Sequence, residues 1–316
     1  MNIENLLRET LADMAGEERP PAPGRYLLVL DRRPRRRGLA LAAASAVAAL
    51  AIGSTVVVQE MSSRAPADVA GQHNAVPHLV PERRPAVTVT VVEGMRLSQL
   101  FKVLSSLTGR PVAEFEKAAK DGTVLGLPPY AKGRLEGFAI PGTYELPPTM
   151  NPDEILRAMV ARFGQAAEDT DLVDGARRAG RTPLEILTIA SIVQAEAGRD
   201  EDMPKIARVI YNRLDRKMRL QMDSTVLYGL DKYGTDAKPG DRKSRSPYNT
   251  YKRLGLPPGP ISSPGDDAIR AALKPASGPW LFYVTTDPKK NITKFAASRS
   301  DFTKLVQERD KKHGIR

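Results

Sequence analysis

The sequence predicts an α+β fold, and three stretches of the chain carry this prediction. Residues 87–94 read VTVTVVEG, and alternation of valine with threonine is typical of a strand. Residues 182–198 read TPLEILTIASIVQAEAG, an apolar run typical of a buried helix. Residues 38–58 carry no charge and are long enough to cross a bilayer. We therefore expect one N-terminal transmembrane helix, a small strand-and-helix unit, and a mainly helical domain with short strands near residues 281–285.

The N-terminal part divides into a tail, a membrane anchor and a linker. At about 1.5 Å per residue, residues 38–58 span roughly 31 Å, which matches the bilayer hydrocarbon. A run of arginines at positions 32–37 precedes them, which places residues 1–37 in the cytoplasm and the rest of the chain outside. A signal peptide is the alternative, but the apolar run is longer than a usual signal core. The prolines of residues 59–86 predict a linker that holds the outer domain off the membrane.

Composition excludes several kinds of chemistry. The net charge of +11 and the pI of about 9.8 predict attraction to polyanions, although no nucleic-acid-binding module is present in the sequence. There is no cysteine, and the three histidines lie in the linker and the C-terminal tail: His73, His78 and His313. Thiol catalysis, a Ser-His-Asp triad, a metal site and an organic cofactor are therefore not expected. Any catalysis by this chain must therefore use carboxylates, amides, hydroxyls or aromatic rings.

The outer part of the chain reads as two consecutive segments. After the first strand, a leucine stripe predicts a helix over residues 97–107, and a second short helix follows around residues 115–120. Residues 135–148, LEGFAIPGTYELPP, predict a closing strand or hairpin, and Asn151 then caps the next helix. The predicted domains are residues 87–148 and 149–316.

The helix predicted within residues 182–198 begins with residues that are typical of an α-helix N-terminus. Thr182 is the expected N-cap, Pro183 occupies the first helical position, and Glu185 completes a capping box. Gly198 supplies a C-terminal stop.

Glu196 is unusual in this helix because Ile192 and Val193 share its face. Burial beside aliphatic side chains and the negative end of the helix dipole both predict a raised pKa, as a general acid requires. The alternative is a partly exposed glutamate at a helix end, paired with Arg199 or Arg213.

Two later stretches carry polar side chains suited to a sugar ligand. They read RLQMDSTVLYGL at 219–230 and SPYNTYKRLGLPPGPISSPG at 246–265. The prolines and glycines of the second stretch exclude regular structure and predict a long ordered loop. Such loops are often functional, although a packed surface loop without function is the alternative. The residues alone therefore indicate an anchored extracytoplasmic protein and a carboxylate-dependent glycosidase.

The motifs ASIVQAEAG, VIYNRLDRKMRLQMDSTVLYG and SPYNTYKRLGLPPGPISSPG, in this order, resemble the YceG-like family of endolytic murein lytic transglycosylases. The resemblance covers roughly residues 85–308. It implies a LysM-like βααβ subdomain at residues 87–148, a catalytic domain at 149–316, and Glu196 as the catalytic residue. It also implies that the glycan groove is lined by Asn212, Gln221, Asp223, Tyr248, Asn249 and Thr250. Many relatives carry two histidines near the C-terminus, whereas this chain reads ITKFAASRSDF at 292–302.

The resemblance implies cleavage of the bond between N-acetylmuramic acid and N-acetylglucosamine, with a 1,6-anhydro product and one carboxylate. We expect peptidoglycan strands as substrate, wall synthases as partners, and a single-pass position in the cell membrane with the catalytic domain outside. Two alternatives stay open: a hydrolytic muramidase that uses Asp223 as its second carboxylate, and a non-catalytic, membrane-tethered wall-binding protein.

Overall fold

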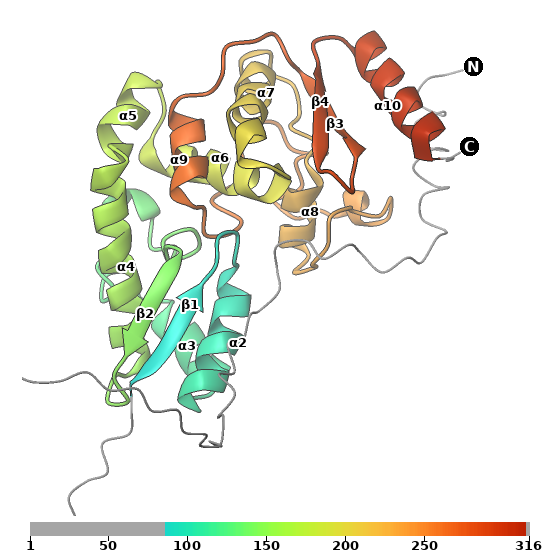
Figure 1. Ribbon diagram of the computed structural model, residues 1–316. Helices are drawn as coiled ribbons and strands as arrows, with labels where there is room; N and C mark the ends of the chain where they lie inside the picture. Colours follow the sequence, from blue (N-terminus) through green and yellow to red (C-terminus); the bar gives the residue numbers. More distant parts are fainter. Residues whose placement is uncertain (1–85, 314–316) are drawn as a thin grey trace, which may run out of the picture. The chain divides into compact units, whose positions relative to one another are not determined.

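The computed structural model describes residues 86–313 (Figure 1). The predicted tail, the predicted transmembrane helix at 38–58 and all but the last residue of the predicted linker lie outside the described residues. Among residues 86–313, no helix is both long and apolar enough to cross a membrane. The described residues mix helices with two small sheets and belong to one compact unit, consistent with the predicted α+β class.

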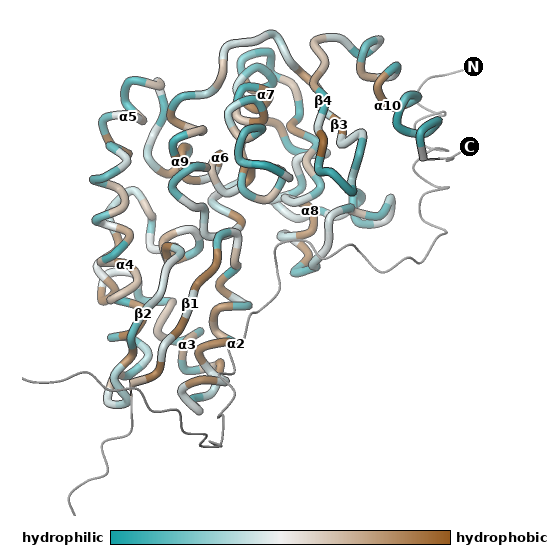
Figure 2. The backbone as a smooth tube through the Cα atoms, viewed as in Figure 1, coloured by the Kyte–Doolittle hydropathy of each residue, from teal (hydrophilic) through white to brown (hydrophobic). Residues whose placement is uncertain are grey.

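The first part of the described chain runs strand, helix, helix, strand. Its two strands pair antiparallel, with Val89 opposite Tyr144. Figure 2 shows that the first strand and the helix after it are rich in hydrophobic residues, and both contribute to the core. The likeness to a LysM unit stays a prediction. The elements are β1 (Val87–Val91), α2 (Leu97–Thr108), α3 (Val112–Ala118), the 3-10 turn η1 (Pro129–Ala131) and β2 (Gly142–Leu146).

Helix α4 (Pro152–Asp169) joins this first part to the rest of the molecule. Asn151 caps it, accepting a hydrogen bond from the Glu154 N–H at 2.9 Å while the Glu154 carboxylate accepts from the Asn151 N–H. Phe163 of α4 packs edge-on against Phe138, with ring centroids 4.8 Å apart. One continuous hydrophobic core therefore runs from the first strand through the later helices.

Helix α6 (Pro183–Glu196) lies in the middle of the helical part and packs against helices on several sides. Thr182 caps it and Glu185 completes the capping box, as the sequence predicts. Nearly all its side chains are buried, which explains its apolar composition. Its neighbours are α5 (Leu172–Arg178), α7 (Met203–Asp215), α8 (Asp223–Gly229) and α9 (Asp266–Leu273).

The chain ends in a second two-stranded sheet and a helix. Strand β3 (Phe282–Asp287) pairs antiparallel with β4 (Ile292–Ala296), which confirms the short strands expected near residues 281–285. Helix α10 (Arg299–His313) packs on β3, where Phe302 stacks on Phe282 with centroids 5.3 Å apart. The stretch that departs from the family pattern thus forms β4 and the start of α10.

Candidate active site

Glu196 is the last residue of α6, and two hydroxyl groups hold its carboxyl. The Ser224 hydroxyl donates to Oε1 at 2.6 Å, and the Tyr283 hydroxyl donates to Oε2 at 2.7 Å. Ser224 comes from the first turn of α8 and Tyr283 from β3, so three separate elements fix one carboxyl group. The side chain is half-buried and keeps some access to solvent.

The environment raises the pKa of Glu196 above its usual value. Burial is the largest cause, because it disfavours the charged form. The hydrogen bonds from Ser224 and Tyr283 oppose this effect, while the negative charge of Asp223 adds to it. A carboxyl with a raised pKa that still faces solvent can act as a proton donor near neutral pH.

The alternative of a glutamate paired with a nearby arginine does not describe this site. Arg199 donates to the backbone oxygen of Lys290 and pairs with Glu201. Arg213 is buried and donates to backbone oxygens, including that of Leu281 at 2.6 Å. Among the described residues, therefore, the hydrogen bonds to Glu196 come from hydroxyl and backbone groups.

Asp223 lies next to the site but is itself ion-paired. The Arg242 guanidinium donates from Nε to Oδ1 at 3.1 Å and from Nη2 to Oδ2 at 2.8 Å. The same guanidinium lies over the ring of Tyr251, 4.8 Å from its centroid. A two-pronged pair of this kind engages both carboxylate oxygens of Asp223 and fixes their orientation.

Asn249 and Thr250 are fully buried, so in this structure they support the wall of the site. The Asn249 amide donates to the backbone oxygens of Arg242 and Ser244 at 2.9 and 2.8 Å, which ties the start of the long loop to the segment before it. The Thr250 hydroxyl accepts from the Met222 N–H at 3.0 Å, which fixes the start of α8. The predicted contact of Asn249 and Thr250 with the glycan stays a prediction.

The other three predicted groove residues differ from one another in hydrogen bonding and in exposure to solvent. Asn212 donates to the backbone oxygens of Gly278 and Trp280 at 3.0 and 2.8 Å, so its amide orders the segment before β3. Gln221 is exposed, just before α8, and Tyr248 is half-buried in the long loop. Contact of Gln221 and Tyr248 with a sugar stays a prediction.

The long loop predicted at residues 246–265 contains no helix or strand, and α6 holds its far end. The Ile261 N–H donates to the Ser191 hydroxyl at 3.0 Å, and the Gly265 N–H donates to the Gln194 side-chain oxygen at 2.9 Å. Both acceptors come from the helix that carries the acid, so loop and acid share one rigid support.

Sequence reasoning missed Ser224 and Tyr283, the two residues that hold Glu196. Ser224 directly follows Asp223 in the stretch RLQMDSTVLYGL, and its place in that stretch is the one sequence signal that could have found it. Tyr283 lies in a predicted strand, where nothing local distinguishes it from a packing residue.

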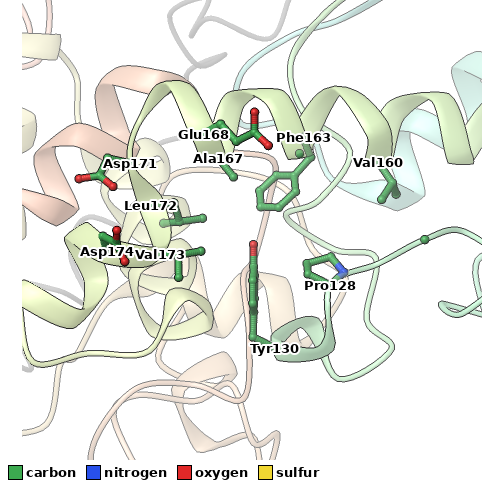
Figure 3. A pocket seen from close by; sticks show the side chains of 12 residues that line it. Pro128, Tyr130, Val160, Phe163, Ala167, Glu168, Asp171, Leu172, Val173 and Asp174 are labelled. Carbon is green, nitrogen blue, oxygen red and sulfur yellow. The ribbon is translucent and has the colours of Figure 1, made fainter.

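A separate hollow of about 530 Å³ opens between η1, α4 and α5, and Glu196 is not among its lining residues. Figure 3 shows Tyr130 standing in it with its hydroxyl end toward α4, which carries Glu168. Asp171 and Asp174 at its edge are ion-paired with Arg178 and Arg177. This hollow has no carboxyl held as Glu196 is, so we place the candidate active site at Glu196.

Fold and site together define an α+β protein in which a half-buried carboxylic acid at the end of a central helix lies beside an ordered loop. The chain belongs to the YceG-like family, which matches residues 64–308. A YceG-like protein of known structure from Listeria monocytogenes is 30% identical, with a TM-score of 0.63 over 69% of this chain and 76% of that one.

Two curated relatives carry the name "Endolytic murein transglycosylase". The one from Bacillus subtilis (strain 168) is 30% identical over 241 residues, which cover 72% of this chain and 64% of the relative. The one from Streptococcus pneumoniae (strain D39) is 31% identical over 253 residues, which cover 72% of this chain and 45% of the relative. The match therefore spans less than two thirds of either relative's length.

Proposed function

We propose that this protein is an endolytic peptidoglycan lytic transglycosylase that cleaves between N-acetylmuramic acid and N-acetylglucosamine. The single observation that carries the proposal is the Glu196 carboxyl, half-buried, raised in pKa and held by Ser224 and Tyr283. The names of the two curated relatives support the same substrate and reaction.

In the proposed reaction Glu196 acts first as an acid and then as a base. Its proton passes to the glycosidic oxygen, and the bond from that oxygen to C1 of N-acetylmuramic acid breaks. Positive charge develops at C1 and the ring oxygen. The ionised carboxylate then takes the proton of the C6 hydroxyl of the same sugar, whose oxygen attacks C1. A 1,6-anhydro ring forms, no water is consumed, and Glu196 is protonated again.

Each hydroxyl at Glu196 has a defined part in this cycle. The Ser224 and Tyr283 hydroxyls stabilise the carboxylate that exists between the two proton transfers. They also fix the carboxyl group in one orientation, which proton transfer requires. Burial and the charge of Asp223 raise the pKa of Glu196 and so favour return of the proton.

The engagement of Asp223 favours a single-carboxylate mechanism. A retaining glycosidase needs a second carboxylate free to attack C1, and an inverting one needs it free to activate water. Arg242 engages both oxygens of Asp223. The proximity of Asp223 to Glu196, which contributes to the raised pKa, nevertheless makes a hydrolytic muramidase the second candidate.

We further propose that residues 38–58 anchor the protein in the cell membrane with the catalytic part outside. An anchor followed by a short linker keeps Glu196 near newly made glycan strands, where cleavage ends their growth and wall synthases are the expected partners. The full chain should sediment with membranes, and removal of residues 38–58 should release it. A full-length chain that stays in the supernatant when membranes are sedimented would contradict the predicted anchor.

Digestion of purified peptidoglycan tests the activity. We expect anhydro ends with the full chain and none with Glu196→Gln, which keeps the side chain's size but has no acid proton. Glu201→Gln is the matched control, because Glu201 is an exposed glutamate just beyond α6, and it should cleave normally. Products with reducing ends would favour the muramidase. Binding without cleavage would leave a wall-binding tether.

A further inference from the structure

Glu136 is a second half-buried carboxyl, and the proposed reaction does not use it. It lies between η1 and β2. Its two oxygens are 3.3 and 3.4 Å from the backbone nitrogen of Leu97, the first residue of α2. Its Oε2 also accepts from the Tyr228 hydroxyl at 3.2 Å. One carboxyl group thus joins the start of α2 to α8.

Helix α8 connects this carboxyl to the acid of the candidate site. Ser224 and Tyr228 are four positions apart on α8, so they share a face about 6 Å apart along its axis. Ser224 donates to Glu196 at one end of this face, and Tyr228 donates to Glu136 at the other. The two carboxyls therefore hold the same helix.

Aromatic and charged side chains surround the Glu136 carboxyl. The Arg96 guanidinium lies over the Tyr228 ring at 5.4 Å, and Tyr248 packs edge-on against that ring at 4.7 Å. These charged and titratable side chains face Glu136 from the N-cap of α2, from α8 and from the long loop. Burial raises the pKa of Glu136 to about 7, and the Leu97 N–H, the Tyr228 hydroxyl and Arg96 oppose that rise.

The backbone beside Glu136 is packed just as closely. Gly137 has a φ of +87°, and a Cβ there would lie 2.5 Å from the Pro260 side chain. The segment that carries Glu136 therefore lies against the long loop as well as against α8. A movement of the Glu136 carboxyl would therefore displace both the long loop and α8.

We propose that Glu136 is a positioning residue: through Tyr228 it fixes α8, and thereby keeps the Ser224 hydroxyl on Glu196. Its effect on rate rests on the function proposed above, whereas the coupling between the two carboxyls does not. Because the Ser224 hydrogen bond lowers the pKa of Glu196, loosening α8 raises that pKa. A residue that only stabilises the fold would leave it unchanged.

The test is a carbon-13 NMR titration of the Glu196 carboxyl in the full-length protein, with the signal assigned by its loss in Glu196→Gln. We expect Tyr228→Phe and Glu136→Gln each to raise the pKa of Glu196, by less than Ser224→Ala does. Combined with Ser224→Ala, neither should raise it further, because the contact they support is already gone. An unchanged pKa in both single variants, or shifts that add in the double variants, would overturn the proposal.

Kinetics and a control complete the test. On peptidoglycan, Tyr228→Phe should lower kcat about tenfold with little change in KM, since the acid is displaced and not the sugar contacts. Glu154→Gln is the matched control, because Glu154 also accepts a backbone N–H at a helix start, that of Asn151 at 2.8 Å. It should leave kcat and the Glu196 pKa unchanged. If the wild type does not cleave, the proposed function fails, and the titration still decides the coupling.

Discussion

Removing the Tyr283 hydroxyl should move the pH range over which Glu196 keeps its proton. This hydroxyl donates to Oε2 of Glu196 at 2.7 Å and stabilises the ionised carboxylate. A hydrogen bond to a charged group contributes about 1.5 kcal/mol at the low end of its range, and about 1.4 kcal/mol corresponds to one pKa unit. Tyr283→Phe should therefore raise the pKa of Glu196 by about one unit.

The pH dependence of kcat/KM on solubilised glycan strands measures this change. The wild type should lose activity as pH rises, because the acid loses its proton, and Tyr283→Phe should lose it about one unit higher. Tyr211→Phe is the matched control: its buried hydroxyl donates to the backbone oxygen of Ala272 at 3.0 Å, away from Glu196. A basic limb that stays in place or moves to lower pH in Tyr283→Phe would refute the reasoning. So would a wild-type profile that is flat to about pH 9.

Three further predictions follow from the same contacts. Asp223→Asn should move the basic limb to lower pH, opposite to Tyr283→Phe, because it removes a negative charge that raises the pKa of Glu196; an upward move would contradict this. Asn249→Ala should lower the free energy of unfolding by about 2–3 kcal/mol in urea titrations, since the buried Asn249 side chain loses three hydrogen bonds to partly buried backbone groups; a change under about 0.5 kcal/mol would count against it. Burial raises the pKa of Glu136 from its ordinary value of about 4.5 to about 7, so the folded state holds its proton more tightly than the unfolded chain does. Wild-type stability should then fall by up to about 3 kcal/mol relative to Glu136→Gln as pH rises from about 4.5 to 7, and parallel stability curves would disprove it.

The central helix could be predicted because its signals are local. Thr182, Pro183 and Glu185 act within one turn of one another, and the apolar run after them needs a core whatever surrounds it. Glu196 could be singled out for the same reason, since its aliphatic neighbours are its own helix partners. The strand order of residues 87–146 likewise follows from alternation and turn signals.

The partners of Glu196 could not be predicted because they arrive from far along the chain. Ser224 and Tyr283 are 28 and 87 positions away, and only the packing of α8 and β3 brings them to one carboxyl. The bonds of Asn249 are hidden from the sequence in the same way. Its amide donates to the backbone oxygens of Arg242 and Ser244, which precede the long loop, and a backbone acceptor leaves no side-chain signal. Its contact with the sugar stays a prediction.

The role of Glu136 could not be predicted from the sequence for a related reason. Glu136 lies in a stretch punctuated by glycine and proline, which reads as a turn between strands. Its importance depends on Tyr228, 92 positions later, and on the burial that both share with α2. The spacing of residues along the sequence does not predict a contact between Glu136 and Tyr228.

Digestion of peptidoglycan in water enriched in oxygen-18 tests the central claim most directly. The account predicts anhydro ends that carry no heavy oxygen, because the C6 hydroxyl of the substrate and not water attacks C1, and no such products from Glu196→Gln. Reducing ends labelled with oxygen-18 would contradict it. They would show that water is the nucleophile and would favour a muramidase, for which Asp223 is the candidate second carboxylate.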